Sequence, residues 1–209
     1  MENEFLYALD LFGTFVFALT GAVKAVKNKL DFLGVLVFAM TVGCAGGMIR
    51  DVLLGTVPVA AYQNASYIIV SLIAGVLVFA FASKIDGRWS LITYADAIGL
   101  GVFTALGCAK AANSGVGAVG ILFSGTLTAV GGGVLRDVFV HEIPMIFASD
   151  FYASAAIFGG LFFLLLSHFN IKADYVLVAT IIFTIALRVI GYQLHFSLPV
   201  AKLREEKKK

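Results

Sequence analysis

The stretch GGMIRDVLLGTVP, residues 46–58, closes a strongly apolar run with two glycines, an arginine and an aspartate. The stretch GGVLRDVFVHEIP, residues 132–144, repeats it 86 positions later with the same glycines, Arg-Asp pair, valine and final proline. Glycine weakens a helix, and an ionised side chain is expensive in hydrocarbon. Two copies of so costly a pattern indicate an organised duplication, and its meaning depends on whether the chain lies in a membrane.

Composition places the chain in a membrane. Of its 209 residues, 60% are hydrophobic and only 13% are charged, whereas soluble domains carry roughly 25% charged residues. Because backbone groups in lipid must be satisfied internally, we expect an all-α membrane protein, a bundle of helices of about 20 residues each. The predicted transmembrane helices are seven apolar runs, at residues 5–26, 32–54, 65–83, 93–113, 116–140, 150–168 and 174–194.

The distribution of basic residues predicts the orientation. The leading residues MENE are acidic, unlike the basic start of a signal peptide, so the first run is expected to remain as a helix. Only Arg50, Lys110 and Lys172 lie on the N-terminal side of the membrane under this topology. The other side holds Lys24, Lys27, Lys29, Lys84, Arg88, Arg136, Lys202, Arg204, Lys207, Lys208 and Lys209. This bias predicts a plasma-membrane protein with the N-terminus outside and the C-terminus in the cytoplasm.

A shift of 86 positions aligns the chain with itself without a gap. DLFGTFVFALTGAVKA, residues 10–25, meets DAIGLGVFTALGCAKA, residues 96–111. Each unit contains three spans, and an odd number makes the second copy enter the membrane from the opposite side. The sequence therefore predicts an inverted repeat, with units at 1–88 and 89–172, followed by a seventh helix and basic tail at 173–209. Gene history alone, with the polar residues kept for folding, is the alternative.

The shared residues of each first helix fall on one face. Asp10, Gly13, Phe17, Gly21 and Lys24 are spaced by 3, 4, 4 and 3 residues, which keeps them within about 80° on a helix. The second copy repeats the stripe with Asp96, Gly99, Phe103, Gly107 and Lys110. Small residues let helices approach closely, so the stripe is either a helix-packing surface or one wall of an ion or substrate pathway. In the first case the Asp and Lys at its ends reach out to the lipid headgroups.

The glycine clusters predict where two longer helices bend or unwind. VGCAGG, residues 42–47, and AVGGG, residues 129–133, precede the two Arg-Asp pairs. A broken helix is tolerated in a membrane only where its backbone is buried in protein or lines water, and it exposes carbonyls that can meet an ion. The expected breaks are at Gly46, Gly47, Gly131, Gly132 and Gly133.

Topology and symmetry together divide the charged residues into two neutral groups. Asp10, Arg50, Asp51 and Lys110 fall in the outer half of the membrane. Lys24, Asp96, Arg136 and Asp137 fall in the inner half. Adjacent residues point about 100° apart on a helix, so each Arg and Asp is expected to pair with a neighbouring span rather than with each other.

The remaining polar residues predict structural roles. Cys44 and Cys108 lie in apolar, glycine-rich surroundings and are expected to be buried packing residues, not metal ligands. Arg188 either snorkels or holds the bundle together, and His141-Glu142 is not expected to belong to the symmetric arrangement. His168, His195 and Trp89 are expected at the membrane interface. No nucleophile-base pair, phosphate-binding loop or metal-ligand spacing is present, which predicts a protein that is not an enzyme and has no cofactor.

The doubled Gly-Gly-x-x-Arg-Asp motif and the seven spans resemble the prokaryotic TRIC proteins, the trimeric intracellular cation channels. The resemblance implies a homotrimer with a pore in each protomer, lined mainly by the first, second, fourth and fifth spans. It also implies second and fifth spans broken at the glycines, although Ala45 stands where the second copy has Gly131. The implied pore charges are Lys24, Arg50, Lys110 and Arg136, with Asp51 and Asp137 beside them and Asp10 and Asp96 as a second rank.

Three functions remain open from the sequence. The first is a passive channel for the monovalent cations K⁺ and Na⁺, in which the aspartates neutralise the basic side chains and backbone carbonyls meet the ion. The second is a secondary transporter of a small zwitterion such as glycine, and the third is a structural or lipid-organising bundle. All three have membrane lipid as a partner, and none involves nucleic acid.

Overall fold

The structure is a computed structural model that describes residues 4–85, 87, 90–148, 151–169 and 171–194. All regular elements in these residues are helices. They are α1 (Glu4–Lys27), α2 (Phe32–Leu53), α3 (Ala60–Gln63), α4 (Ser66–Ala80), α5 (Ala82–Ile85), α6 (Ser90–Asn113), α7 (Ala118–Phe139), α8 (Met145–Ala148), α9 (Tyr152–His168) and α10 (Ala173–Gln193).

Five of these helices are long and apolar enough to cross a membrane, namely α1, α2, α6, α7 and α10. The apolar helices α4 and α9 are shorter, with 15 and 17 residues. At 1.5 Å per residue, α4 is about 22 Å long, less than a bilayer core of about 30 Å. The predicted spans 65–83 and 150–168 therefore form shorter helices than expected, and α5 continues α4 after a turn at Phe81.

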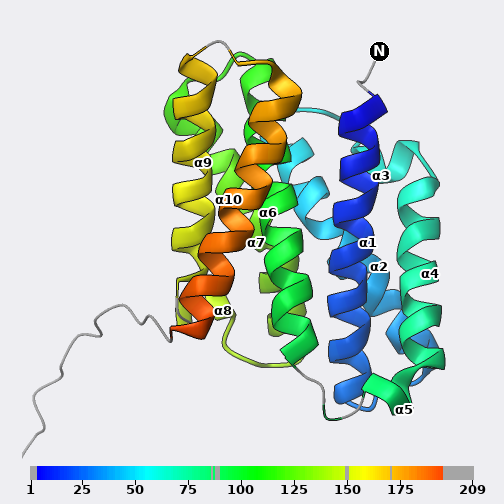
Figure 1. Cartoon of the computed structure of the whole chain (residues 1–209). Helices are drawn as coiled ribbons and strands as arrows, with labels where there is room; N and C mark the ends of the chain where they lie inside the picture. Colours follow the sequence, from blue (N-terminus) through cyan, green and yellow to red (C-terminus); the bar gives the residue numbers. More distant parts are fainter. Residues whose placement is uncertain (1–3, 86, 88–89, 149–150, 170, 195–209) are drawn as a thin grey trace, which may run out of the picture.

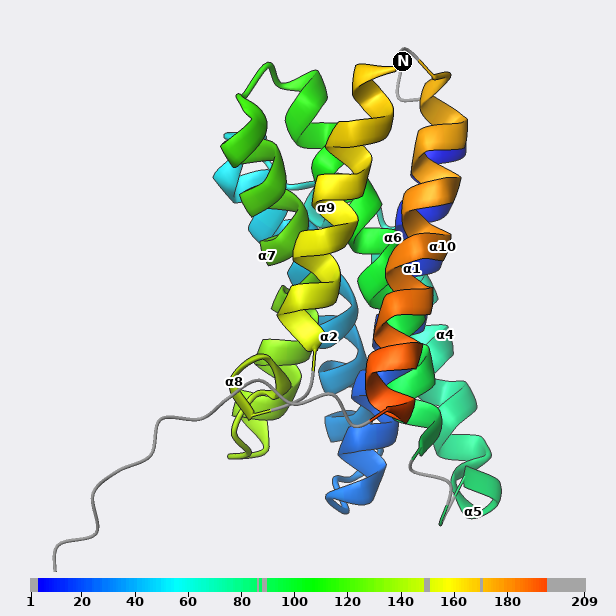
Figure 2. The same ribbon diagram turned by 60° about the vertical axis from the view of Figure 1, so that its left-hand side comes forward.

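The long helices pack as two groups of three with α10 added to the second. Helices α1, α2 and α4 contact one another, and α6, α7 and α9 do the same. The α1–α6 and α2–α7 contacts join the groups, and α10 packs on α6 and α9. Figures 1 and 2 show this arrangement, and in Figure 1 α9 lies at the left edge of the bundle and α4 at the right edge.

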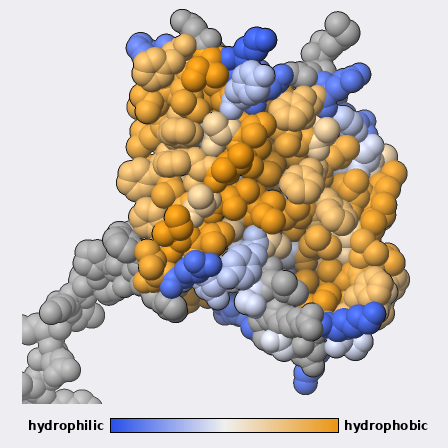
Figure 3. All heavy atoms as spheres, viewed as in Figure 1, coloured by the Kyte–Doolittle hydropathy of each residue, from blue (hydrophilic) through white to orange (hydrophobic). Residues whose placement is uncertain are grey.

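The outer surface is suited to lipid. Figure 3 shows a broad hydrophobic band over the middle of one face, with hydrophilic residues gathered toward the two ends of the helices. Large apolar side chains such as Phe12, Ile69, Leu165 and Ile182 are exposed on the helices. Burial of so many apolar groups in acyl chains is favourable, so the bundle is a membrane protein.

Polar caps and charges mark the helix ends. The side chain of Asp31 accepts a hydrogen bond from the backbone nitrogen of Gly34 at 2.7 Å and so caps the start of α2. Helix α1 has Glu4 in its first turn and both Lys24 and Lys27 in its last, which complements the helix dipole. The predicted interfacial residues Trp89 and His195, and the basic tail, lie outside the described residues.

The glycine clusters do not unwind their helices, so the expected unwinding there was wrong, whereas the expected bend stays a prediction. Helix assignment runs without interruption through Gly46 and Gly47 in α2, and through Gly131, Gly132 and Gly133 in α7. The physical reason is close packing of the two helices. A Cβ atom at Gly132 would lie 2.9 Å from the carbonyl oxygen of Val42, and one at Gly46 would overlap the carbonyl oxygen of Thr128.

Candidate functional site

A buried ion cluster lies between α1, α2, α4 and α6, and we call it the Asp10 cluster. The Arg50 guanidinium donates Nη1 to Asp10 Oδ1 at 3.1 Å and Nη2 to Asp10 Oδ2 at 3.0 Å. Its Nε donates to Asp51 Oδ1 at 2.9 Å. All three side chains are buried. Such a bidentate pair is strong and geometrically specific, so Arg50 is held in one position.

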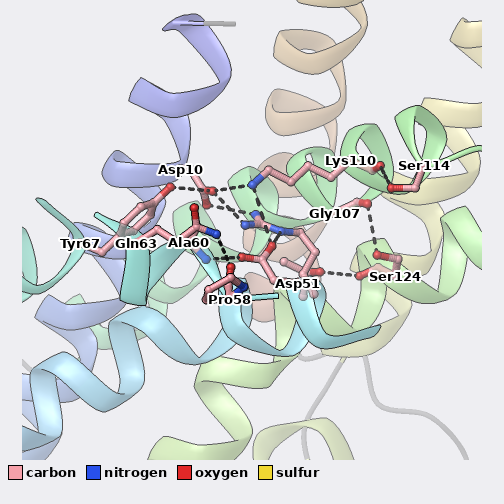
Figure 4. A network of polar contacts seen from close by, with 12 residues as sticks. Asp10, Asp51, Pro58, Ala60, Gln63, Tyr67, Gly107, Lys110, Ser114 and Ser124 are labelled. Carbon is pink, nitrogen blue, oxygen red and sulfur yellow. Dashed lines mark hydrogen bonds and ion pairs between the residues drawn. The ribbon is translucent and has the colours of Figure 1, made fainter. Parts of the chain in front are cut away.

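Two more side chains complete the Asp10 cluster from other helices. Lys110 of α6 places Nζ 3.4 Å from Asp10 Oδ2 and 3.9 Å from Asp51 Oδ1. Tyr67 of α4 donates its hydroxyl to Asp10 Oδ2 at 3.2 Å. Figure 4 shows Tyr67 and Lys110 reaching Asp10 from opposite sides. The cluster therefore ties the two groups of three helices together through Asp10.

A second cluster, which we call the Asp96 cluster, repeats the central contacts. Arg136 of α7 donates Nη1 to Asp96 Oδ1 at 2.6 Å and Nε to Asp137 Oδ1 at 2.9 Å. Lys24 of α1 reaches into it from the other group of helices, with Nζ 4.0 Å from Asp137 Oδ1. The predicted division of the charged residues into two groups agrees with these contacts, since each cluster holds the expected four residues.

The expected pairing within each cluster was wrong in one respect. Each arginine bonds both to an aspartate on another helix and to the aspartate that follows it in sequence. The prediction considered only the directions of the Cβ atoms. A guanidinium carries several donors on a long stem, so Nε can turn back to the adjacent carboxylate while the terminal nitrogens reach across the helix interface.

The aspartates after the arginines have a second partner each. Asp51 Oδ2 accepts a hydrogen bond from the backbone nitrogen of Ala60 at 2.9 Å, where α3 begins. Asp137 Oδ2 accepts one from the nitrogen of Met145 at 3.1 Å, where α8 begins. Each carboxylate thus connects the buried arginine to the short helix that follows the next loop of the chain. The Arg-Asp pair therefore fixes the loop as well as the cluster.

Sequence reasoning missed the tyrosines. Tyr67 bonds Asp10, and the hydroxyl of Tyr152 lies beside Asp96 over the same face of Gly133. These tyrosines are 85 positions apart rather than 86, so a gapless comparison at one offset does not pair them. Allowing a one-residue gap between the second and third spans of each unit would have found them.

Glu142 and Arg188 also join the Asp96 cluster. Glu142 Oε2 lies 2.5 Å from Lys24 Nζ, a contact that Thr56 at the aligned position of the first copy cannot make, so Glu142 joins the cluster without belonging to its symmetric part. Arg188 of α10 is buried, with its guanidinium 4.8 Å from the centre of the Tyr152 ring. It therefore contacts α9 inside the bundle rather than snorkelling to the surface. His141 and His168 are exposed in the structure.

A polar cavity opens beside the Asp10 cluster. Its volume is about 270 Å³. It is lined by Tyr7, Asp51, Thr56, Ala60, Gln63, Asn64, Tyr67 and Lys110. Lys110 is the most accessible charge of the cluster, with 23% of its side chain exposed. Water and small solutes can therefore reach one edge of the cluster from the end of the bundle that carries α3.

The two cysteines lie in the interior of the bundle. Cys44 and Cys108 are both buried and unoxidised, in different helices. Among the residues that the structure describes, no group of three or more His, Cys, Asp or Glu side chains has the arrangement of a metal site. The packing role expected of both thiols agrees with their burial.

Comparison with known proteins identifies the family. The family model described as glycine transporter matches residues 7–83 and 93–168, one segment in each half of the chain. A UPF0126 membrane protein of Vibrio cholerae is 34% identical over 97% of this chain and 85% of its own length. The UPF0126 inner membrane protein YadS of Escherichia coli K12 is 32% identical over 96% and 98% of the two chains.

Solved structures give the same result. A structure described as a TRIC cation channel superposes with a TM-score of 0.87 at 33% identity and covers 95% of this chain and 98% of that one. The TRIC trimeric intracellular cation channel orthologue from Rhodobacter sphaeroides superposes with a TM-score of 0.88 at 31% identity, covering 92% and 99%. The chain therefore belongs to the glycine transporter, or UPF0126, family of membrane proteins, which includes the prokaryotic TRIC channels.

Proposed function

We propose that this protein is a passive channel for monovalent cations, chiefly K⁺ and Na⁺, with a pore inside each protomer. The observation that carries the proposal is the pair of buried ion clusters, placed toward the two ends of the same α1–α6 helix pair. Buried ionisable groups in a membrane bundle are expensive, and they mark ion or substrate pathways. The likeness to structures described as TRIC cation channels supports the same function.

The basic side chains do not exclude cations in this proposal. Each arginine is bonded to two carboxylates, so its positive charge is neutralised where it stands. Lys110 and Lys24 likewise contact carboxylates of their clusters. A passing ion then meets carboxylate and carbonyl oxygens beside neutralised cations. The residues assigned to the pore are Lys24, Arg50, Asp51, Lys110, Arg136 and Asp137, with Asp10 and Asp96 as their partners.

We further propose that the two groups of three helices form an inverted repeat across the membrane. The matching contacts support this, because Arg50–Asp10 and Arg136–Asp96 join residues 40 positions apart in each half. The proposed units remain 1–88 and 89–172, with 173–209 outside the symmetry. The N-terminus is then outside the cell and the C-terminus inside, in the plasma membrane.

The proposed assembly is a homotrimer. The orthologue from Rhodobacter sphaeroides is described as a trimeric channel, and its fold matches nearly the whole chain. A pore within each protomer leaves the outer apolar faces of the bundle free for lipid and for the neighbouring subunits. Apart from lipid and the permeant K⁺ or Na⁺, the proposal includes no cofactor and no catalytic activity.

The alternative is secondary transport of a small zwitterion such as glycine. Two observations favour it, the description of the family model and the 270 Å³ cavity, which lies against both the Lys110 ammonium and the Asp51 carboxylate. A zwitterion could place its carboxylate and ammonium there. Alternating access in such a carrier would move one group of helices against the other around a fixed site.

Liposome assays separate the two functions. Purified protein in liposomes loaded with K⁺ is expected to give a voltage-driven K⁺ flux that rises linearly with the gradient and needs no glycine. Saturable glycine uptake coupled to an ion gradient, without K⁺ flux, would instead establish the transporter. The variant Lys110→Gln, inside the Asp10 cluster, is expected to change the flux, and Lys84→Gln, on the exposed helix α5, serves as its matched control.

A further inference from the structure

A phenylalanine stands midway between the ion clusters on each of two facing helices. On α1, Phe17 is seven residues from Asp10 and seven from Lys24. On α6, Phe103 is seven residues from Asp96 and seven from Lys110. At 1.5 Å per residue, each ring is about 10 Å along its helix from both clusters. Any path joining the clusters along this helix pair must therefore pass the two rings.

The two rings form one stacked unit. Their centroids are 5.4 Å apart and their planes are inclined by 9°. Neither side chain has any surface exposed to the outside of the bundle. Because α1 and α6 belong to different groups of three helices, this stack is a direct contact between the groups at the centre of the molecule.

Glycines from the facing helices enclose the stack. A Cβ atom at Gly99 would lie 2.9 Å from the Phe17 ring, and one at Gly13 would lie 3.2 Å from the Phe103 ring. Glycines of α7 and α2 close the other sides. A Cβ atom at Gly132 would lie 3.5 Å from the Phe17 ring, and one at Gly46 would lie 3.5 Å from the Phe103 ring. Each ring thus packs directly on the backbone of glycines from two helices, Phe17 on Gly99 and Gly132 and Phe103 on Gly13 and Gly46.

We propose that Phe17 and Phe103 are the constriction of the pore, and that ions pass only when the stack separates. This inference rests on the proposed channel function. Apolar constrictions block ions by excluding water, because an ion that loses its hydration there gains no replacement ligand. The stack divides the pathway into two polar halves, one around each ion cluster. The glycines at 13, 99, 46 and 132 keep the rings in the blocking position.

The test measures K⁺ flux in liposomes for the variants Phe17→Ala and Phe103→Ala. Removing either ring opens an apolar gap between the polar halves, so basal K⁺ flux is expected to rise about tenfold or more. The serine variants, Phe17→Ser and Phe103→Ser, are expected to rise further because a hydroxyl hydrates the gap. The matched control is Phe38→Ala, a buried phenylalanine of α2 that packs edge-on against Phe139, away from the stack. Its flux per folded protein should stay at the wild-type value.

Leucine variants keep the test decisive if alanine prevents folding. Phe17→Leu and Phe103→Leu preserve most of the apolar volume but abolish the stacking, and they are expected to raise the basal flux by about threefold. Wild-type conduction with unchanged flux in folded leucine variants would overturn the constriction and leave the channel function standing. A wild-type protein that passes no K⁺ at any voltage would overturn the channel function itself.

Discussion

The Asp10 and Asp96 clusters share an arginine that bonds two aspartates, and they differ most at their outer edges. In both, a buried arginine bonds one aspartate across the helix interface and the next aspartate in sequence. In the Asp10 cluster the lysine from the other group of helices, Lys110, contacts Asp10 directly and borders an open polar cavity. In the Asp96 cluster, Lys24 is only 10% exposed and is held by Glu142.

One position accounts for much of this difference. Thr56 lines the cavity beside the Asp10 cluster, and Glu142 occupies the corresponding position of the second copy. In both loops the backbone nitrogen at this position donates to the backbone carbonyl oxygen of the aspartate in the Arg-Asp pair. The distance is 2.8 Å from Thr56 to Asp51 and 3.0 Å from Glu142 to Asp137. The same loop geometry therefore leaves one cluster accessible with threonine and covers the other with glutamate. The duplication supplies the ion pairs, and the loop side chain sets their accessibility.

The largest expected effect tests what the clusters share. Arg50→Ala leaves Asp10 and Asp51 as buried carboxylates without their main partner, and Arg136→Ala does the same to Asp96 and Asp137. Removing one partner of a buried ion pair destabilises a protein by about 3–5 kcal/mol. Both variants should lose a similar free energy of unfolding, measured by thermal unfolding in detergent.

A double-variant comparison controls for the loss of packing. Asp10→Asn combined with Arg50→Ala should be less destabilised than the sum of the two single variants, because the pair is removed together. Conduction per folded protein should also fall in both arginine variants, since they line the proposed pore. A large loss in one cluster and none in the other would show that the shared contacts are not equivalent.

The next largest effect tests the shared helix crossing. Gly46→Ala places a methyl group into the carbonyl oxygen of Thr128, and overpacking of this kind costs about 1–3 kcal/mol. Gly47→Ala is the matched control, since its Cβ meets only the flexible end of Arg50 at 3.6 Å. Alanine favours helix over glycine by about 1 kcal/mol, so Gly47→Ala should be neutral or stabilising.

If both alanine variants unfold at the wild-type temperature, the crossing is looser than described. If Gly47→Ala is the more destabilised of the two, α2 depends on flexibility at its glycines rather than on close approach to α7. Either result would favour the bend that the sequence predicts at these glycines.

The third prediction concerns the difference between the clusters. In a background with Cys44→Ala and Cys108→Ala, the variant Lys110→Cys should react with a charged, membrane-impermeant thiol reagent about tenfold faster than Lys24→Cys. The physical reason is access, because Lys110 borders the cavity and Lys24 is nearly buried. The measurement is the labelling rate on intact protein in detergent, where the reagent reaches both ends of the bundle. Equal rates would mean that the two clusters are equally open.

The smallest expected effect isolates Glu142. Glu142→Gln removes the charge that holds Lys24 and leaves the arginine contacts in place. The side chain is half exposed, so the pair is worth no more than about 1 kcal/mol, which corresponds to about a fivefold change in an equilibrium. Open probability in single-channel recordings should rise by up to that factor. Glu142→Thr, which introduces the residue of the first copy, should raise the open probability to the same extent. An unchanged open probability in both variants would show that Glu142 takes no part in gating.

The sequence predicted the helices and the division of charges well. A membrane imposes a minimum apolar length, so runs of about 20 residues locate helices such as α2 and α10 closely. The repeat then assigns each charged residue to one end of the bundle. That is why Lys110 could be placed with Asp10, and Lys24 with Asp137, before any contact was known.

The sequence could not predict what the glycines do or which side chains complete each cluster. Glycine both weakens a helix and permits close approach, and only the position of Thr128 opposite Gly46 decides between the two. Glu142 was set aside because its symmetry mate is Thr56. Its ion pair with Lys24 depends on how the loop folds back after Asp137, and the spacing of residues in the sequence does not determine that loop conformation.

Single-channel recording in asymmetric KCl tests the central claim most directly, namely that the two ion clusters lie on one cation pathway. The account predicts unit currents that reverse near the equilibrium potential of K⁺, and loss of that current in Arg50→Ala or Arg136→Ala protein that remains folded. A reversal near the Cl⁻ equilibrium potential, or an absence of unit current together with saturable glycine uptake, would contradict it.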